Sequence, residues 1–226
     1  MAKTIITLGR EYCTGGRYIA KDVARALGIK LYDKELITMA AKNSGLSEEA
    51  VAASEKRHTH SLLYSLYTMG NDLPLGDQVF ILQSRIIKQL ADEGPCVIVG
   101  RCANFILKGR PNLFSVFLHA DRNTRMQRVI ENYGVKPGGA ARTMDIMDAR
   151  RRTHCLHYTG QELGNARLYN LCVNTSDYGL ERTVELILEA INTRTEQSSS
   201  VETVPVHSAS FPEPEAGSIP GEISLA

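Results

Sequence analysis

The sequence predicts an α/β domain in which helices pack on a mainly parallel sheet. Short apolar runs alternate along the chain with amphipathic segments of about 10–18 residues, a pattern typical of consecutive βα units. One run, residues 96–99 (CVIV), is apolar throughout and is expected to be a strand buried on both faces. A chain of 226 residues that is 43% hydrophobic and 23% charged suits one globular domain.

The N-terminal elements are predicted to be a strand, a glycine-containing loop and a helix. Residues 3–8 (KTIITL) form a β-branched run, and apolar residues then recur at helical spacing from Ile19 to Leu27. Gly28 follows directly and is suited to end that helix in a left-handed conformation. This order of elements is the start of a βα unit.

A weaker second strand is expected at residues 30–32, followed by a helix from about Asp33. Ser47 and the two glutamates after it have the composition of another helix start, whereas residues 57–75 are hard to assign. The other predicted elements are a helix at 76–93, strands at 96–99, 113–119 and 171–173, a helix from a cap at Asp121 to about 132, and a closing helix at 180–191.

Residues 195–226 differ in composition from the rest of the chain. They contain no Lys or Arg, five Glu, four of the eight prolines and seven serines. Such a segment buries too little apolar area to offset its chain entropy, so we expect a disordered tail after a folded body that ends near Asn192. The body, residues 1–194, then holds 26 basic and 20 acidic residues, and its excess positive charge is available for an anionic ligand.

Composition also excludes several classes of protein. No apolar run approaches the roughly 18–20 residues of a membrane-spanning helix, and the start MAKTIITLGR lacks the apolar region of a signal peptide. The five cysteines are odd in number and form no CxxC pair, which argues against a disulfide framework or a zinc ribbon. We therefore expect a cytoplasmic protein with reduced thiols and no membrane partner.

The loop after the first strand, GREYCTGGR at residues 9–17, is the first candidate for chemistry, because ligands bind beyond the carboxyl ends of parallel strands. Glycines let backbone N–H groups approach a phosphate, and the start of the next helix adds donors and a favourable dipole. The standard GxxxxGK[ST] pattern is absent. These residues alone leave two interpretations open, a phosphate-binding loop and an ordinary turn before a helix.

Five collinear segments carry a resemblance to a known family. They are TIITLGREYCTGGRYIAKDVARALGIKLYDKELI, VIVGRCANFIL, FSVFLHADRNTRMQRV, ARRRTHCLHYTGQELG and LYNLCVNTSDYGLERTVELI. Together they resemble the cytidylate kinase-like family of small P-loop nucleotide kinases, whose loop typically reads SREYGSGGREIA. The resemblance covers most of residues 3–192. It implies a three-layer P-loop NTPase-like domain at 1–194, with a lid at about 137–164.

The resemblance also implies an activity, which is transfer of a phosphoryl group from ATP, with Mg²⁺, to a nucleoside monophosphate, CMP by analogy. The expected partner is thus a small-molecule nucleotide. Two alternatives stay open: a catalytically weak or inactive nucleotide-binding protein, and a kinase for another small acceptor. A nucleic-acid partner is not expected, because it would rest only on the basic stretch 101–152, which has no recognisable reader motif.

Aligned with cytidylate kinases, whose loop ends in GKST, the chain has Gly16 at the lysine and Arg17 at the serine that touches Mg²⁺. Arg17 is therefore expected to replace the missing catalytic charge. Cys13 stands where relatives usually have glycine, so its β-carbon costs energy if the loop needs a positive φ. A reactive thiol is the alternative to a bland substitution there. The residues expected to contact ATP are Arg10, Cys13, Thr14, Gly15, Gly16, Arg17 and Tyr18.

On the acceptor side, Asp33 lies where cytidylate kinases have an aspartate after the second strand. It is expected to hold metal-bound water or orient the acceptor, to cap a helix, or to do both. Arg101 matches the arginine of the GRD segment that grips the acceptor nucleotide. Cys102 replaces the aspartate of that segment, which leaves the sugar contact without its usual residue.

The triple arginine Arg150–Arg152, with Arg142 upstream, lies where relatives carry an arginine-rich lid. Adjacent residues point around a helix, so at least one of the three can face the phosphates. Arg151 is expected to be catalytic, and Arg142, Arg150 and Arg152 to bind substrate.

Two further segments complete the predicted surroundings of the site. Arg122, Arg125 and Arg128 fall at i, i+3 and i+6 and are expected to form a solvated helix face. Residues 174–176 (NTS) match the loop on the adenine side of nucleotide kinases.

Overall fold

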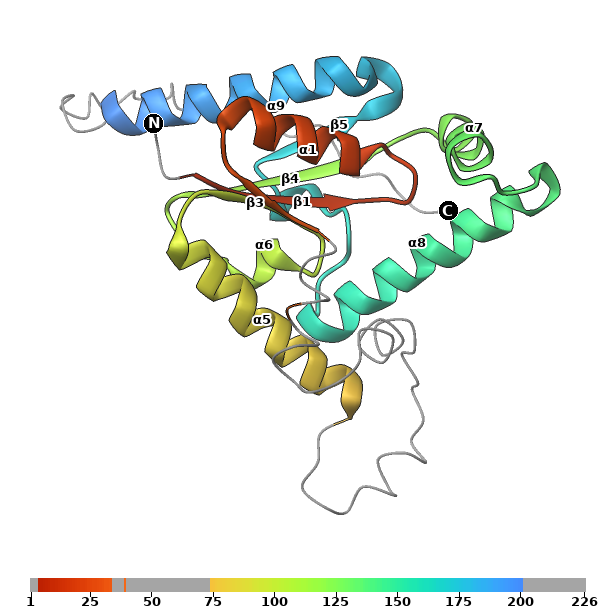
Figure 1. Ribbon diagram of the computed structural model, residues 1–226, viewed down its shortest axis with the longest axis horizontal. Coiled ribbons are helices and arrows are strands. Elements are labelled where there is room, and N and C mark those ends of the chain that lie inside the picture. Colours follow the sequence, from red (N-terminus) through yellow and green to blue (C-terminus); the bar gives the residue numbers. More distant parts are fainter. Residues whose placement is uncertain (1–3, 34–38, 40–73, 201–226) are drawn as a thin grey trace, which may run out of the picture.

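The computed structural model describes residues 4–33, 39 and 74–200. Within these residues, five strands form one parallel sheet with the order β2-β3-β1-β4-β5 (Figure 1). The strands are β1 (Ile5–Arg10), β2 (Lys30–Tyr32), β3 (Cys96–Val99), β4 (Leu113–His119) and β5 (Leu171–Asn174). Since β1 pairs with both β3 and β4, the loop that follows β1 starts at the centre of the carboxyl edge. This confirms the predicted α/β fold class with a parallel sheet.

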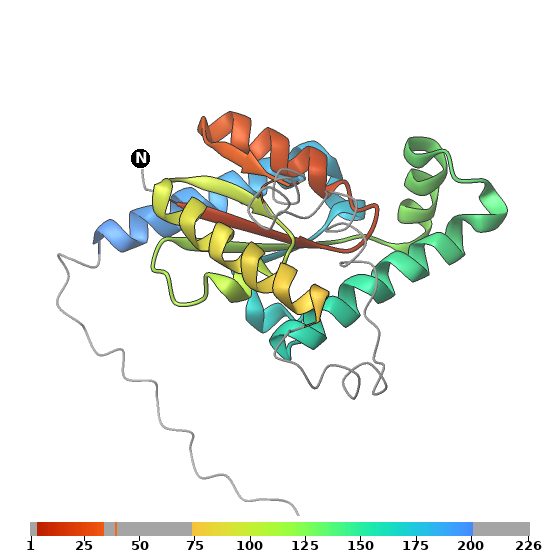
Figure 2. The same ribbon diagram turned by 60° about the horizontal axis from the view of Figure 1, so that its bottom comes forward.

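Helices cover both faces of the sheet and extend beyond one end of it. Figures 1 and 2 show α1 and α9 on one face, α5 and α6 on the other, and α7 with α8 projecting at the end where the strands finish. The helices are α1 (Gly16–Leu27), α5 (Leu75–Glu93), α6 (Ala103–Ile106), α7 (Arg122–Tyr133), α8 (Pro137–Thr159) and α9 (Thr175–Ser200). None of those in the described ranges is long and apolar enough to cross a membrane.

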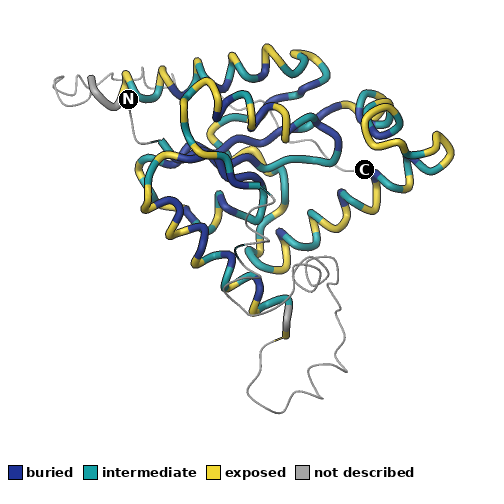
Figure 3. Tube along the Cα trace, in the orientation of Figure 1, coloured by how far each residue is buried: buried dark blue, intermediate teal, exposed yellow. Residues whose placement is uncertain are grey.

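Two apolar cores lie on opposite faces of the sheet, because successive strand side chains point to opposite sides. Ile6 and Leu8 of β1 pack with Ile19 of α1 and Ile187 of α9. Ile5 faces the other way, into a core with residues of β3 and α5. In Figure 3 the three central strands, β3, β1 and β4, are therefore mostly dark blue, whereas the outer sides of the helices carry yellow. The predicted doubly buried strand at 96–99 is confirmed, with all four residues buried.

The closing helix is longer than the sequence predicts. It begins at Thr175, contains a non-helical break at Gly179 with φ 69°, and continues to Ser200 rather than ending near Asn192. Arg194 anchors its last turns, because Nη1 donates to the carbonyl of Leu113 at 2.6 Å. The helices predicted near Asp33 and Ser47, and residues 201–226 of the predicted tail, lie outside the described residues.

Deleting residues 201–226 should leave the melting temperature unchanged, because their sequence has no Lys or Arg and no periodic apolar face that could dock on the body. A truncation that ends at residue 193 also removes Arg194, whose guanidinium lies over the ring of Phe114 at 5.9 Å. We expect that second truncation to lower the melting temperature by about 2–4 °C for each kcal/mol lost. Calorimetry of both truncations checks this, and an equal drop in both would show that the last 26 residues pack.

Candidate active site

The loop after β1 turns sharply before α1 begins. Two of its residues have left-handed backbones, Cys13 with φ 61° and Gly15 with φ 81°. The carbonyl of Gly15 accepts the N–H groups of Tyr18 at 2.9 Å and Ile19 at 3.2 Å, which starts the helix. The first N–H groups of α1 therefore lie directly behind the loop, where they favour an anion.

Gly15 fits this turn for two separate reasons. Its φ favours glycine, and a methyl group there would lie 2.3 Å from Cδ2 of Leu180 on α9. Gly15→Ala should therefore shift the loop against α9, weaken the ATP binding expected from the sequence at least tenfold and lower the melting temperature. Gly28→Ala is the matched control, since Gly28 has φ 64° but no atom within 4 Å of an added methyl group. The Gly28→Ala variant should cost about 1–2 kcal/mol of backbone strain. Titration calorimetry should show no change in its affinity for ATP.

Cys13 is buried in the loop, and burial raises the pKa of its thiol to about 11. A raised pKa leaves little thiolate at neutral pH. A cysteine without a chemical role is therefore a better interpretation of this residue than a reactive thiol. Its positive φ is also the backbone state in which a β-carbon is costly.

Asp33, directly after β2, forms ion pairs with two arginines of the loop region. Its Oδ2 accepts a hydrogen bond from Nε of Arg17 at 2.8 Å, and its Oδ1 lies 3.5 Å from Nη2 of Arg10. The two arginines differ in exposure, because the side chain of Arg17 is 52% exposed and that of Arg10 is 16% exposed. Asp33 thus joins the end of the second strand to the loop.

Arg10 lies among other positive charges. Burial, with nearby Arg151, Arg101 and Arg17, lowers its pKa to about 9, while Asp33 acts in the opposite direction. A charged group held in this way is stabilised by an added anion, because the anion offsets both the burial and the repulsion. The site therefore suits a phosphate.

Arg101 reaches this cluster from an unusual turn after β3. Gly100, Arg101 and Cys102 all have positive φ, at 77°, 56° and 54°. The turn is held to the sheet because the N–H of Gly100 donates to the carbonyl of Leu8 at 3.0 Å. Two non-glycine residues in this conformation store strain, which proteins concentrate at binding sites.

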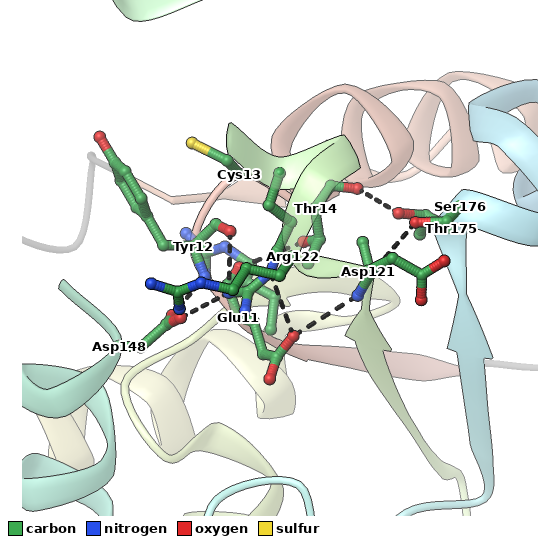
Figure 4. Close-up of polar contacts among 12 residues, drawn as sticks. Glu11, Tyr12, Cys13, Thr14, Asp121, Arg122, Asp148, Thr175 and Ser176 are labelled. Carbon is green, nitrogen blue, oxygen red and sulfur yellow. Dashed lines mark hydrogen bonds and ion pairs between the residues drawn. The ribbon is translucent and has the colours of Figure 1, made fainter. Parts of the chain in front are cut away.

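Helix α8 crosses the loop and contacts its backbone at two points. Arg151 donates from Nη1 to the carbonyl of Arg10 at 3.1 Å, and its guanidinium lies 5.5 Å from the ring centre of Tyr12. One turn earlier, Asp148 accepts the N–H of Tyr12 at 2.7 Å (Figure 4). The segment predicted to be a lid is therefore fastened to the loop in this state, and burial lowers the pKa of Arg151.

The predicted solvated face of α7 is wrong for two of its three arginines. Arg125 is buried and pairs with Asp148, while Arg122 forms a two-bonded pair with Asp145 at the surface. Both pairs join α7 to α8. Arg128 is also partly buried. The physical reason is that α8 supplies a carboxylate that pairs with Arg125, whereas Arg128 contacts Thr175 of α9 and the carbonyl of Cys13.

Helix α9 supports the loop from its other side. Thr175 is fully buried and donates its hydroxyl to the carbonyl of Thr14 at 2.9 Å (Figure 4). Arg128 donates to the hydroxyl of Thr175 at 3.0 Å and reaches the carbonyl of Cys13 at 3.5 Å. The loop is therefore held by α7, α8 and α9 before any ligand binds.

Two clefts lie at this edge of the sheet. A cleft of about 180 Å³ follows the loop from Arg10 to Tyr18 and is closed on one side by Met147 and Arg151 of α8. A larger cleft of about 380 Å³ lies between β4, β5 and the end of α8, and Arg152 lines it. The smaller one has the glycines and arginines that a phosphate needs, so it is the stronger candidate despite its size.

The sequence as a whole matches one family over most of its length. The model of the cytidylate kinase-like family matches residues 5–177. The chain belongs to the cytidylate kinase-like family. Two curated relatives are named cytidylate kinase. The one from Thermoplasma volcanium is 22% identical over 189 residues, which is 83% of this chain and 90% of that protein. The one from Pyrococcus horikoshii is 24% identical over 191 residues, 84% of this chain and 89% of that protein.

Solved structures agree with the fold of this cytidylate kinase-like chain. An uncharacterized protein from Eubacterium ventriosum is 28% identical with a TM-score of 0.67, covering 84% of this chain and 99% of that one. A gluconokinase from Sinorhizobium meliloti is 15% identical with a TM-score of 0.52, and the match covers 89% of this chain and 98% of that one. The second match shows the fold alone.

In this family member, the structure brings together five of the residues that the sequence suggested for the site. Those five are Arg10, Arg17, Asp33, Arg101 and Arg151. The other three arginines lie apart from the loop cleft. Arg142 and Arg150 are exposed, and Arg152 lines the second cleft. Only one member of the triple arginine thus faces the loop, as the rotation of a helix requires.

Sequence reasoning missed that Asp148, Arg125 and Thr175 hold the loop in place, because it assigned Arg125 to a solvated helix face and Thr175 to a loop on the adenine side. The sequence gives only a weak indication of the role of Asp148. A single carboxylate close to Arg150–Arg152 in the chain suggests an ion pair with one of those arginines. Its partners are instead the N–H of Tyr12 and Arg125, which are far away in the sequence.

The residues present fit magnesium only partly. Both carboxylate oxygens of Asp33 already face arginines, at 2.8 and 3.5 Å. Among the residues that the structure describes, no three His, Cys, Asp or Glu side chains gather as a metal site. This donor set suits an ion carried mainly by phosphate oxygens and water.

Proposed function

We propose that this chain transfers the γ-phosphoryl group of ATP to a nucleoside monophosphate of the CMP type. The observation that carries the proposal is the convergence of four arginines and one aspartate on a glycine-containing loop at the centre of the carboxyl edge. Family membership over residues 5–177 supports a kinase-like activity.

The chemistry requires little from the protein besides position and charge. An acceptor oxygen forms a bond to the γ-phosphorus, the bond to the β–γ bridging oxygen breaks, and ADP leaves with that electron pair. Negative charge spreads over the transferring group, which arginines stabilise. Arg151 is proposed to face the transferring group from the lid, and Arg101 to bind the acceptor phosphate.

Asp33 is proposed to position the acceptor side of this site. Its pairs with Arg10 and Arg17 orient both guanidiniums toward the loop cleft. Mg²⁺ on the nucleotide phosphates would supply further neutralisation of charge. Asp33 contributes to that ion through water, since its own oxygens are engaged by the arginines.

The experiment is a coupled assay of ADP release with ATP, Mg²⁺ and a panel of acceptors. CMP, UMP and AMP are tested beside gluconate and other small hydroxyl compounds, and thermal stabilisation by ATP is measured in parallel. We expect turnover with CMP above all other acceptors. Turnover only with a hydroxyl compound would overturn the acceptor, and stabilisation by ATP without any ADP release would favour a nucleotide-binding protein without turnover.

Arg101→Ala separates the two substrates in the same assay. Because Arg101 is proposed to bind the acceptor, this variant should raise the KM for CMP at least tenfold and leave ATP affinity within about threefold, the loss expected for one charge-assisted contact. Equal losses for CMP and ATP, measured by titration calorimetry, would mean that Arg101 serves both sites or the fold.

A further inference from the structure

Compared with the standard GxxxxGK pattern, the loop has its positive charge and one of its glycines in exchanged positions. Counted from Gly15 as the second glycine of GxxxxGK, Arg10 occupies the place of the first glycine and Gly16 the place of the lysine. The standard pattern thus has a small residue where this chain has its cation, and a cation where this chain has a glycine.

The two exchanged residues touch in the structure. A methyl group added to Gly16 would lie 2.9 Å from Cδ of Arg10, so the stem of Arg10 occupies the space into which a side chain at position 16 would start. Further along, Nη1 of Arg10 passes over Gly100, where an added methyl group would lie 2.8 Å away. The absence of side chains at Gly16 and Gly100 therefore leaves room for the side chain of Arg10.

The guanidinium of Arg10 has capacity left for a ligand. It carries five N–H donors, and the contact described for it is the one with Asp33, at 3.5 Å, which is long for a hydrogen bond. Arg10 also lines the cleft along the loop. By contrast, Arg17 uses Nε in a 2.8 Å bond to Asp33 and is half exposed.

We propose that Arg10 supplies the positive charge that a P-loop lysine supplies in the standard pattern, and that it reaches the β and γ phosphates from the first loop position over Gly16. This rests on the proposed phosphotransferase function. The role expected for Arg17 from the sequence passes to Arg10, and Arg17 becomes a positioning residue that holds Asp33.

The test is to move the cation back to position 16. Arg10→Ala should weaken binding of inorganic tripolyphosphate and ATP at least tenfold and lower kcat by about 10²–10³, as for other groups that stabilise developing charge. Gly16→Lys alone should also be impaired, because the lysine and Arg10 compete for one space. The double variant Arg10→Ala/Gly16→Lys should recover at least tenfold over Arg10→Ala in both readouts.

The matched control is Arg10→Ala/Gly16→Ala, which fills the same space without charge and should show no recovery. Arg25→Ala removes an exposed arginine at the far end of α1 and should bind tripolyphosphate like the unaltered chain. Arg10→Met keeps the stem over Gly16 without the charge, so it reports on the charge if Arg10→Ala unfolds. Circular dichroism confirms the fold of each variant.

Two results would overturn the assignment of Arg10. One is equal binding by the lysine and alanine double variants when both are folded, and the other is unchanged tripolyphosphate affinity in Arg10→Ala and Arg10→Met. The proposed transferase function fails separately, if the chain binds tripolyphosphate and ATP but releases no ADP with any acceptor. Binding then still decides whether Arg10 contacts the phosphates.

Discussion

Asp148→Ala is expected to lower the free energy of unfolding by about 3–5 kcal/mol, the cost of removing one partner of a buried ion pair. Asp148 is 5% exposed and Arg125 is 8% exposed, so water cannot replace the lost carboxylate. The substitution also leaves the N–H of Tyr12 without its 2.7 Å acceptor. Urea denaturation of the unaltered chain and of Asp148→Ala at the same pH measures the difference in the free energy of unfolding.

Asp145→Ala is the matched control on the same helix. Its pair with Arg122 has the same spacing of 23 residues, but both side chains are more than half exposed, at 56% and 53%. A pair this exposed contributes little to stability, because solvent screens its charges. Equal destabilisation by the two variants would mean that Glu11, whose Oε2 lies 3.6 Å from Nε of Arg125, takes over as its partner.

Arg151→Ala is expected to reduce kcat for ADP release by about 10²–10³, the loss typical of one group that stabilises transition-state charge. Arg151 also donates to the carbonyl of Arg10, so its removal loosens the backbone from which the proposed phosphate contact extends. ATP affinity should fall less than kcat, because Arg151 is proposed to act chiefly on the transferring group. Steady-state kinetics and calorimetric titration together give the two values.

Arg150→Ala provides the comparison within the triple arginine. Arg150 is exposed, and its described contact is with Sδ of Met147 at 3.8 Å, so its loss should reduce kcat at least tenfold less than that of Arg151. Similar losses of kcat in Arg150→Ala and Arg151→Ala would indicate that the basic stretch acts through the electrostatic field of all its charges together. That outcome would contradict a specific contact by Arg151.

Most of the fold could be predicted because its signals are local. Continuous apolar runs such as 96–99 gave the strands, and helical spacing with a terminal Gly28 gave α1, which ends there with a left-handed φ of 64°. The end of α9 was harder to predict. Its continuation to Ser200 is supported by Arg194, which donates to the carbonyl of Leu113 at the start of β4, 81 residues earlier. Such a contact leaves no local pattern in the sequence.

The candidate site divides in the same way. Glycines and arginines near the ends of strands could be recognised, because topology brings those ends to one edge. Which arginine fills which space depends on contacts between residues distant in sequence or on opposite sides of a turn. The buried state of Arg125 and the path of Arg10 over Gly16 and Gly100 are both of this kind.

The contact between Arg10 and Gly16 constrains how such a loop can arise by mutation. A chain with the standard glycine at 10 and lysine at 16 cannot acquire this arrangement one substitution at a time without an impaired intermediate. Gaining the arginine first puts two long side chains in one space, since an added methyl at 16 already lies 2.9 Å from Arg10. Losing the lysine first removes the charge that position 16 supplies before Arg10 can replace it. Homologues should therefore fall into two discrete groups at positions 10 and 16, with mixed pairs rare, and a search for the lysine pattern alone would pass over one group entirely.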